Sequence, residues 1–453
     1  MRVMIIGAGK VGYSLAEMLS MENHDVVVID KASERLKVVD ESLDVQTILG
    51  SGSSKKVLED AGVDEVKMLI AVTEFDELNM VACITAKHYG VKKTVARVRD
   101  PEYVGDDKAS NSFLGIDLII NPERVTAKEI AKLLEVPEAI NVDYYADGKV
   151  QLLELKIDES SPVLNVKLKD LPFEYPYLIV AILRGEKMII PSGEDMIKAN
   201  DFVFVIGKTK EMVKIEELLG EKRTSVENVF ILGAGRVGYY LAQILSKKKK
   251  KYSVKVVDKD IKKCQRIADD TDNVLVLKGD GTDTELLKNE SIDKTDAFVA
   301  VTGDDKVNLL VSLMAKNMGA KRTLAQVRRS DYAPMMEQVG IDIAVTPREL
   351  TAAAILKNIR QGKIVSLTLL GGAKAEVIEL IVSEDYSYAK KPLKDIKFPK
   401  GAILGAILRE GKALIPSGDD WVLPGDQVMV FALPSAIANV ENFFENKKRF
   451  GLF

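Results

Sequence analysis

The chain has 453 residues, of which 47% are hydrophobic and 29% charged, a composition typical of a folded globular protein. Its length predicts about three or four domains. The 64 basic and 68 acidic side chains give a net charge of −4, which argues against a nucleic-acid partner bound through the overall field. The apolar runs are far shorter than the roughly 20 residues of a membrane-spanning helix, and no signal-peptide pattern is present. We therefore expect a cytoplasmic protein.

The chain contains two copies of one unit. The segment VMIIGAGKVGYSLAEML at Val3–Leu19 recurs as VFILGAGRVGYYLAQIL at Val229–Leu245. Further along, VAILRGEKMIIPSGED at Val180–Asp195 recurs as GAILREGKALIPSGDD at Gly405–Asp420. Self-similarity on this scale indicates an internal duplication. Because the second match lies well beyond the first, each unit is predicted to contain a larger front lobe and a smaller back lobe.

Short β-branched runs alternate with helical patterns along the first front lobe. Near-continuous apolar strands separated by helices predict a parallel sheet covered on both faces, and six strands complete a doubly wound nucleotide-binding fold. The back lobes show short strand patterns with Pro-Ser-Gly turns, which indicate small α/β units. The predicted strands of the first front lobe are Arg2–Ile6, Asp25–Asp30, Asp44–Leu49, Met68–Thr73, Thr94–Arg97 and Leu118–Ile120.

The predicted fold class is therefore α/β, with two tandem units. Each unit contains a Rossmann-like doubly wound parallel sheet followed by a small α/β C-terminal lobe. We place the Rossmann domains at residues 1–135 and 226–358, and the C-terminal lobes at residues 140–222 and 363–447.

A glycine fingerprint opens each front lobe. In this pattern the first glycine makes a tight turn off the strand, the second lets backbone approach a pyrophosphate, and the third lets helix and strand pack closely. The helix N-terminus that follows offers free backbone N–H groups to phosphate. Each copy follows an apolar strand and opens a helix, which makes the signal stronger than the glycines alone. The glycines are Gly7, Gly9 and Gly12 in the first copy and Gly233, Gly235 and Gly238 in the second.

An acidic residue ends the strand after each fingerprint. These residues are Asp30 and Asp258, about 20 residues beyond the glycines, as in dinucleotide-binding domains. A carboxylate at this place accepts hydrogen bonds from ribose hydroxyls and repels a 2′-phosphate. The pattern therefore favours NAD or ATP over NADP.

A second motif is repeated after the fourth strand. Thr73 and Thr302 each begin the pattern Thr-x-x-Asp-x-x-Asn, at the carboxyl edge of the sheet where ligands lie in this fold. For the acidic residues of the motif, Asp76 and Asp305, two interpretations stay open. They either contact the ligand or serve as an ordinary N-cap of the next helix.

The copies differ at two places near the predicted ligand. Ser51 corresponds to Asp280, and Arg97 corresponds to Gln326. An arginine at this strand end can pair with a phosphate or a carboxylate. An unpaired Asp280 would repel a pyrophosphate, unless it accepts a hydrogen bond from a ribose or an adenine amino group. We expect the first site to bind NAD or NADH more tightly, or the second to prefer a different nucleotide.

The chain lacks the residues that several enzyme classes need. A hydride-transferring dehydrogenase usually has a proton-handling group beside the nicotinamide, but His24 and His88 have no counterpart in the other half. No P-loop motif is present. Cys83 and Cys264 fit buried thiols rather than metal ligands. We therefore predict no catalytic residue, no metal site, and a ligand sensor rather than an enzyme.

These features together resemble the TrkA family, the peripheral nucleotide-binding subunits of Trk-type potassium uptake systems. The resemblance covers essentially the whole chain. It rests on GAGKVG with Asp30, GAGRVG with Asp258, the VTxxDxxN segments, NMVACITA at Asn79–Ala86, and the Pro-Ser-Gly back lobes. The front lobes are similar to RCK or KTN domains, regulators of potassium conductance, and the back lobes to the TrkA C-terminal domain.

The resemblance implies a cytoplasmic regulator at the inner face of the cell membrane. Family members bind NAD or NADH, respond to ATP or ADP, and form homo-oligomeric rings beneath an integral membrane potassium-translocating subunit of TrkH type. The alternatives are an NAD-dependent oxidoreductase and a nucleotide-sensing regulator of a different ion transporter. The nucleotide contacts assigned by position, together with the matched Ser51 and Asp280, are Gly7, Ala8, Gly9, Lys10, Val11, Gly12, Asp30, Ser51, Thr73, Glu74 and Arg97, and then Gly233, Ala234, Gly235, Arg236, Val237, Gly238, Asp258, Asp280 and Thr302.

Overall fold

The chain forms two compact units, and each unit combines segments from both halves of the sequence. The first contains Met1–Ala131 and Val226–Leu356, and the second contains Lys132–Ser225 and Lys357–Phe453. The two front lobes therefore belong to one unit and the two back lobes to the other. The structure, a computed structural model, describes residues 1–21, 24–100, 103, 115–136, 139–172, 174–220, 225–248, 251–359, 364–370 and 375–445.

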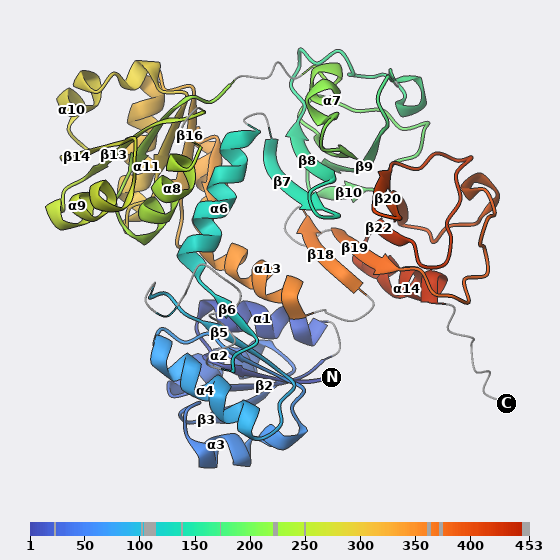
Figure 1. Cartoon of the computed structure of the whole chain (residues 1–453), viewed down its shortest axis with the longest axis horizontal. Coiled ribbons are helices and arrows are strands. Elements are labelled where there is room, and N and C mark those ends of the chain that lie inside the picture. Colours follow the sequence, from blue (N-terminus) through green and yellow to red (C-terminus); the bar gives the residue numbers. More distant parts are fainter. Residues whose placement is uncertain are drawn as a thin grey trace. The chain divides into compact units, whose positions relative to one another are not determined.

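The first front lobe, which begins at the blue N-terminus in Figure 1, is built on a six-stranded parallel sheet. Its strand order is β3-β2-β1-β4-β5-β6. The strand order reverses between β1 and β4. In open α/β sheets, ligands bind at the carboxyl ends of the strands beside such a reversal. The strands are β1 (Arg2–Ile6), β2 (Asp25–Asp30), β3 (Gln46–Leu49), β4 (Met68–Ala71), β5 (Lys93–Arg97) and β6 (Leu118–Ile120). The helices are α1 (Lys10–Met21), α2 (Ser33–Ser42), α3 (Lys55–Asp60), α4 (Asp76–His88) and α6 (Pro122–Glu135), with a 3₁₀ turn at Val63–Glu65.

The burial of these strands explains why the apolar runs form them. Every residue of β4 is buried, and so are the last four residues of β1, as expected for strands covered by helices on both faces. All six predicted strands are confirmed. The bounds of β1, β2 and β6 agree with the prediction, and those of β3, β4 and β5 differ by one or two residues at one end.

The second front lobe repeats the architecture in the order β14-β13-β12-β15-β16-β17. The parallel Rossmann-like sheets confirm the predicted fold class. The strands are β12 (Asn228–Leu232), β13 (Ser253–Asp258), β14 (Val274–Lys278), β15 (Ala297–Ala300), β16 (Arg322–Gln326) and β17 (Ile343–Val345). The helices are α8 (Arg236–Ser246), α9 (Ile261–Asp270), α10 (Thr284–Asn289), α11 (Asp305–Asn317), α12 (Ala333–Gln338) and α13 (Pro347–Ile359), with 3₁₀ turns at Ile292–Lys294 and Ser330–Tyr332.

The helices after the two sixth strands join the front lobes to each other. Directly before α6 of the first lobe, Asn121 Nδ2 donates to the Tyr240 hydroxyl of α8 at 3.4 Å. In the opposite direction, Arg348 Nη2 of α13 donates to Ser14 Oγ of α1 at 3.0 Å. Figure 1 shows α6 beside α8 and α13 beside α1. Because the start of α6 contacts the second lobe and the start of α13 contacts the first, the two lobes form one compact unit.

Each back lobe is a five-stranded antiparallel sheet with a short α-helix. The orders are β10-β9-β11-β8-β7 and β18-β19-β22-β20-β21, which is one arrangement counted from opposite edges. None of the helices in the described ranges has the length and apolar character needed to cross a bilayer. The elements are β7 (Ala139–Tyr145), β8 (Val150–Lys156), β9 (Tyr177–Arg184), β10 (Lys187–Ile189), β11 (Phe202–Lys208) and α7 (Met212–Leu218), then β18 (Ile364–Leu370), β19 (Ala375–Ile381), β20 (Ala402–Arg409), β21 (Lys412–Leu414), β22 (Gln427–Ala432) and α14 (Ile437–Glu445), with 3₁₀ turns at Leu168–Asp170, Leu393–Asp395 and Pro434–Ala436.

The two back lobes share a hydrophobic core. Fully buried Phe204 of the first lobe belongs to the same cluster as Val377 and Phe431 of the second. A hydrogen bond from Lys149 Nζ to the Gly411 carbonyl, 2.8 Å long, also joins them. Burial of this apolar surface is the main force that holds the back lobes together.

A pair between a half-buried arginine and a buried aspartate recurs in both back lobes. Arg409 donates from Nε and Nη2 to the two carboxylate oxygens of Asp426 at 2.9 and 2.8 Å, and Asp426 is 3% exposed. Arg184 and Asp201 make the same two bonds at 2.9 and 2.7 Å. The hydrogen bond to the carboxylate raises the pKa of each arginine above its ordinary value. This bidentate geometry is the strong form of the interaction.

Arg409→Ala should lower the free energy of unfolding of the second back lobe by about 1.5–3 kcal/mol, because it leaves a buried carboxylate without its charged partner. Trp421 is the only tryptophan in the chain, and its carbonyl accepts a hydrogen bond from Arg409. Urea unfolding followed by tryptophan fluorescence therefore measures the change. Lys394→Ala, which removes the exposed pair with Asp419, should leave the midpoint unchanged. Equal midpoints for Arg409→Ala and the wild type would show that the buried pair carries no stability.

Candidate functional site

The glycine loops have the backbone geometry that the fingerprint requires. Gly7 and Gly233 have φ values of +109° and +110°, a region that strongly favours glycine. A Cβ on Gly12 would lie 1.8 Å from the Gly7 carbonyl oxygen, so only glycine lets α1 approach β1 this closely. A Cβ on Gly9 would meet nothing within 4 Å, which leaves space for a phosphate beside the backbone. The second copy repeats this contrast, with 1.9 Å at its third glycine and open space at its second.

Helices begin directly after both loops, at Lys10 and Arg236. The first backbone N–H groups of a helix have no partner inside it, and they favour an anion at the helix N-terminus. Lys10 is exposed to solvent. Both loops therefore offer the geometry of a phosphate-binding turn.

Asp30 and Asp258 tie each glycine loop to the end of the next strand. Asp30 accepts the Ala8 N–H at Oδ2, 2.6 Å away, and the Ala32 N–H at Oδ1, 2.8 Å away. Asp258 accepts the two matching N–H groups at 2.7 and 2.8 Å. Each carboxylate oxygen has further lone pairs, so ribose hydroxyls can still bind. Asp30 and Asp258 therefore also hold the glycine loops in place, in addition to their predicted contact with a ribose.

A threonine and an asparagine fix the rim of each site. The N–H and the hydroxyl of Thr73 donate to Asn79 Oδ1 at 2.9 and 2.7 Å. Asn79 Nδ2 in turn donates to the Arg97 carbonyl at 2.8 Å, so this buried side chain joins the ends of β4 and β5. Thr302 and Asn308 make the same contacts in the second copy. The asparagine is a positioning residue.

Asp76 and Asp305 do not cap a helix, so the N-cap interpretation is wrong for both. The N-cap positions of α4 and α11 are Phe75 and Asp304. Asp76 Oδ2 instead accepts the N–H groups of Arg99 and of the next residue, both at 2.8 Å. Asp305 accepts the two matching N–H groups after β16. Both carboxylates therefore hold the loop that follows the fifth strand of their sheet.

Asp280 is paired, which corrects the expectation that an unpaired carboxylate repels a pyrophosphate here. Thr282 donates to it from its hydroxyl at 2.7 Å and its N–H at 2.9 Å, and Lys259 Nζ lies 3.0 Å away. The hydrogen bonds from Thr282, and then the one from Lys259, lower the pKa of Asp280 to about 2. In the first copy, Ser51 Oγ bonds to Ser53 Oγ at 2.9 Å. The first copy has Lys31 at the place of Lys259 but no acid at the place of Asp280, so the copies still differ by one negative charge here.

The second front lobe has a cavity of about 330 Å³ along its glycine loop. Five of the predicted site residues line it: Gly233, Gly235, Asp258, Asp280 and Thr302. The volume lies in the range of small-molecule pockets, about 300–1,000 Å³. The structure thus brings the predicted ribose carboxylate and the predicted phosphate loop to one cavity.

A larger cavity, of about 480 Å³, lies between the two front lobes; we call it the interlobe cavity. The second lobe contributes Gly235–Val237 and Gln326, and the first contributes Val11 and Arg97. Gly235 and Val301–Gly303 line both cavities. The two cavities therefore adjoin along the second glycine loop.

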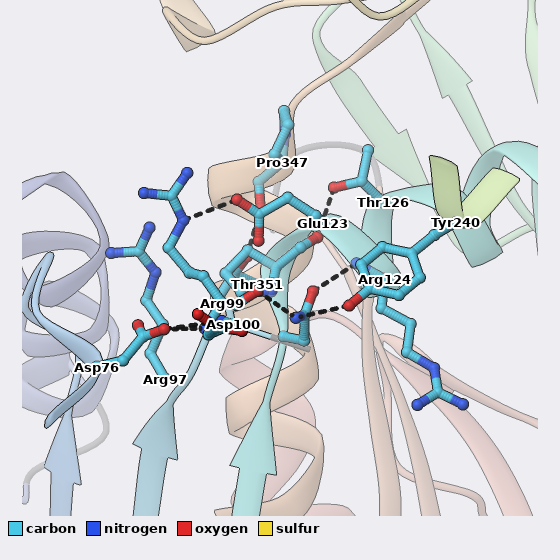
Figure 2. Close-up of polar contacts among 12 residues, drawn as sticks. Asp76, Arg97, Arg99, Asp100, Glu123, Arg124, Thr126, Tyr240, Pro347 and Thr351 are labelled. Atoms are coloured by element: carbon cyan, nitrogen blue, oxygen red, sulfur yellow. Dashed lines mark hydrogen bonds and ion pairs between the residues drawn. The ribbon is translucent and has the colours of Figure 1, made fainter. Parts of the chain in front are cut away.

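The lining of the interlobe cavity carries an excess of positive charge. Arg99 Nε pairs with Glu123 Oε1 at 2.7 Å, and Figure 2 shows this contact with Arg97 next to it. Burial, and then the charge of Arg99, lower the pKa of Arg97. Such a lining attracts an anionic ligand. Its charged residues are Arg97, Arg99, Arg236, Arg328 and Arg348, with Glu123 as the one acid.

Four buried polar atoms on this lining have no hydrogen-bond partner within the described chain. Buried polar groups without a partner are uncommon and costly. A ligand that supplied acceptors to the guanidinium groups would remove part of this cost. The atoms are Arg97 Nε, Glu123 Oε2, Gln326 Oε1 and Arg348 Nε.

The structure separates some of the predicted residues. Arg97, predicted as a first-site contact, shares the interlobe cavity with the second glycine loop, and its Nη1 donates to the Thr73 carbonyl at 3.0 Å. Lys10 and Glu74 are exposed and line neither cavity. Asp30 contacts the first loop through Ala8, and Thr73 lies beside Gly7, but neither of them nor Ser51 lines either cavity.

The glycine and threonine motifs do not point to the other charged residues of the interlobe cavity, although one sequence signal for them exists. The segment NPER at Asn121–Arg124 directly follows β6, and TPRE at Thr346–Glu349 directly follows β17. A proline with charged residues at the first turn of a helix is repeated at the same place in both copies. Such a repeat marks the first turns of α6 and α13, which line the interlobe cavity with Glu123 and Arg348.

Comparison with known proteins identifies the family. The TrkA-N domain matches residues 3–122 and 229–347, and the TrkA-C domain matches residues 152–220 and 377–445. The chain belongs to the TrkA family. One relative, Trk system potassium uptake protein TrkA homolog 2 of Methanosarcina mazei, is 41% identical over 452 residues, covering 98% of this chain and 100% of the relative. The TrkA homolog of Archaeoglobus fulgidus is 37% identical, with 98% and 100% covered.

Solved structures agree with this assignment at the level of the fold. The structure described as "GsuK channel bound to NAD" is similar with a TM-score of 0.61 at 18% identity, covering 98% of this chain and 78% of that one. The GsuK RCK domain has the same TM-score and identity, with 98% and 94% covered. The matched domains and the TrkA relatives confirm the resemblance to the TrkA family that the sequence motifs suggest, including the tandem order of domains.

Proposed function

We propose that this TrkA-family chain is a nucleotide-sensing regulatory subunit of a potassium uptake system and not an enzyme. It docks on an integral membrane subunit of TrkH type at the cytoplasmic face of the membrane and assembles into a ring of identical chains. Relatives of the same length are named as Trk system potassium uptake proteins, and one structural neighbour is described as "GsuK channel bound to NAD". NAD or NADH is the proposed ligand, with ATP or ADP as the alternative.

The continuity of the two cavities carries the nucleotide-sensing part of this proposal. At one end, Asp258 would hold a ribose. The backbone of Gly235–Val237 would hold a pyrophosphate, and Arg97 of the other lobe would meet its charge. A ligand held in this way contacts both front lobes at once.

A ligand shared between two lobes can act as a switch. It shifts their arrangement only by the difference in its affinity for the two states. One partly buried contact between a guanidinium group and a phosphate contributes about 1.5–3 kcal/mol, which corresponds to a population shift of about ten- to a hundredfold. The first turns of α6 and α13 line the interlobe cavity, and both helices run from the first unit into the second. They are the proposed route by which the ligand affects the back lobes.

The first test measures binding. Purified chain is heated with NAD, NADH, ATP, ADP or NADP, and a ligand that binds only the folded state raises the unfolding temperature. We expect at least one adenine nucleotide without a 2′-phosphate to stabilise the chain and NADP to do so least. Stabilisation by none of the five would contradict nucleotide sensing, and turnover of NADH with a candidate substrate would favour the oxidoreductase alternative.

The second test measures transport. Cells that lack the gene should lose most regulated potassium uptake, and the wild-type chain should restore it. A chain with Gly9→Ala and Gly235→Ala should restore much less, whereas Lys394→Ala should restore it fully. Affinity capture from membranes should recover a polytopic potassium-transport subunit. Unchanged uptake after deletion, together with capture of no ion transporter, would contradict the assignment.

A further inference from the structure

Phe75, the residue directly before α4, is exposed to solvent. Its exposed fraction is 59%, which is high for a phenylalanine. At the matching position before α11 the second copy has Asp304, whose carboxylate accepts the N–H groups of Lys306 and Val307. Phe75 makes no such cap. The two copies therefore use this position in different ways.

Phenylalanine is a poor choice here for the stability of the lobe. An N-cap aspartate typically stabilises a helix, and the large apolar residues rank last at this position. An exposed ring also leaves apolar surface in water. A position that breaks a local rule without a structural gain points to a functional demand. The second copy shows that the same backbone accepts a capping residue.

The repeated geometry places Phe75 at the nucleotide site. Thr73 Oγ1 accepts the Phe75 N–H at 3.3 Å, while its hydroxyl proton goes to Asn79. Thr302 Oγ1 accepts the Asp304 N–H at 3.2 Å in the same way, and its proton goes to Asn308. Asp304 lines the second nucleotide cavity. Phe75 therefore occupies the matching place in the first copy.

The neighbours of Asp304 show at which end of the smaller cavity it lies. Asp304 shares the lining of the smaller cavity with Asp258, Asp280 and Thr282, and it does not line the interlobe cavity. The proposed phosphate contacts lie on the interlobe side. Position 304, and with it position 75, thus belongs to the end that would hold the ribose and the base.

We propose that Phe75 is the base-stacking platform of the first nucleotide site and that the second site lacks such a platform. This inference rests on the proposed nucleotide binding. An aromatic side chain that stacks on a base contributes about 1–3 kcal/mol, which is a factor of roughly 5 to 100 in affinity. The first site then selects its ligand through the base, and the second through the charged groups around Asp280.

The experiment isolates the first site by using the full chain with Gly235→Ala, which fills the phosphate approach of the second loop. Three variants are compared in this background: Phe75→Leu, Phe75→Tyr and Phe75→Asp. Calorimetry with ADP measures affinity, and etheno-ADP, whose fluorescence is quenched by stacking, reports contact with the ring. UDP serves as the ligand whose smaller base stacks less.

We expect Phe75→Leu and Phe75→Asp to weaken ADP binding by about 5- to 100-fold and to abolish the quenching. They should weaken UDP binding less. Phe75→Tyr should keep both properties, because it keeps the ring. Phe75→Asp should also raise the unfolding temperature, since it restores a cap. A reciprocal Asp304→Phe, made with Gly9→Ala, should create quenching at the second site.

Two outcomes would overturn the inference while leaving nucleotide binding intact. One is an unchanged ADP affinity and quenching in Phe75→Leu. The other is a change in oligomeric state without any change in the ratio of ADP to UDP affinity, which would assign Phe75 to an association surface with the exposed Val81 and Ile84 of α4. Absence of nucleotide binding in the wild-type chain would instead reject the proposed function itself.

Discussion

Gly9→Ala and Gly235→Ala should each reduce nucleotide binding at their own site by more than about a hundredfold, with little change in folding. Neither Cβ would meet any atom within 4 Å, and Gly235 has a φ of −66° that alanine adopts readily. The added methyl group would lie where the pyrophosphate must approach the backbone. Calorimetry gives the affinity of each variant, and thermal unfolding reports its stability.

The third glycine of each motif provides the matched control. Gly12→Ala and Gly238→Ala would place a Cβ 1.8 and 1.9 Å from a carbonyl oxygen of the same loop, so helix and strand must separate. Overpacking of this kind costs about 1–3 kcal/mol or more. These variants should therefore lose stability as well as binding. Normal nucleotide affinity in Gly9→Ala and Gly235→Ala would contradict the placement of the phosphate at these loops.

The strands could be predicted because burial on both faces leaves continuous apolar runs in the sequence. β1, β2 and β6 have the predicted bounds. The predicted run that became β4 extends two residues too far, since Thr73 bonds to Asn79 instead of continuing the strand. The pairing of front lobe with front lobe could not be predicted. It depends on contacts such as that of Arg348 with Ser14, which link surfaces more than three hundred residues apart.

Some residues of the candidate site could likewise be predicted and others could not. The glycines and Asp30 could be predicted because the local backbone of the loop requires them. Arg99 and Glu123 could not, because they meet the second glycine loop only where the lobes contact each other. The pairing of Asp280 with Lys259 also depends on how one loop folds over another. Residues that act through the packing of two lobes leave little periodic signal in either.

The position of Arg97 changes the meaning of its replacement by Gln326. Both residues line the interlobe cavity, so the substitution does not simply separate a strong site from a weak one. One lobe supplies a guanidinium group and the other an amide to a shared space. A duplicated chain can vary the two faces of such a cavity independently, whereas two identical chains would have to present the same residue from each side.

Asp30→Ala and Asp258→Ala should each weaken adenine-nucleotide binding by about 1–3 kcal/mol at their own site, because each loses a charge-assisted hydrogen bond to the ribose. The loss of the carboxylate should also narrow the preference for NAD over NADP, since the repulsion of a 2′-phosphate is removed. Calorimetry with both dinucleotides on the full chain measures the two effects.

The asparagine variants separate charge from loop structure. Each aspartate also accepts a backbone N–H from the glycine loop, at 2.6 Å for Asp30 and 2.7 Å for Asp258. Asn at either position keeps one oxygen that can accept this bond but carries no charge. If the carboxylate acts on the ribose, the asparagine variants should fold normally and still lose much of the preference against NADP. If only the contact with the glycine loop matters, the asparagine variants should bind nucleotides as the wild type does, and only the alanine variants should lose affinity. Unchanged affinity for every nucleotide in all four variants would reject the ribose assignment at both sites.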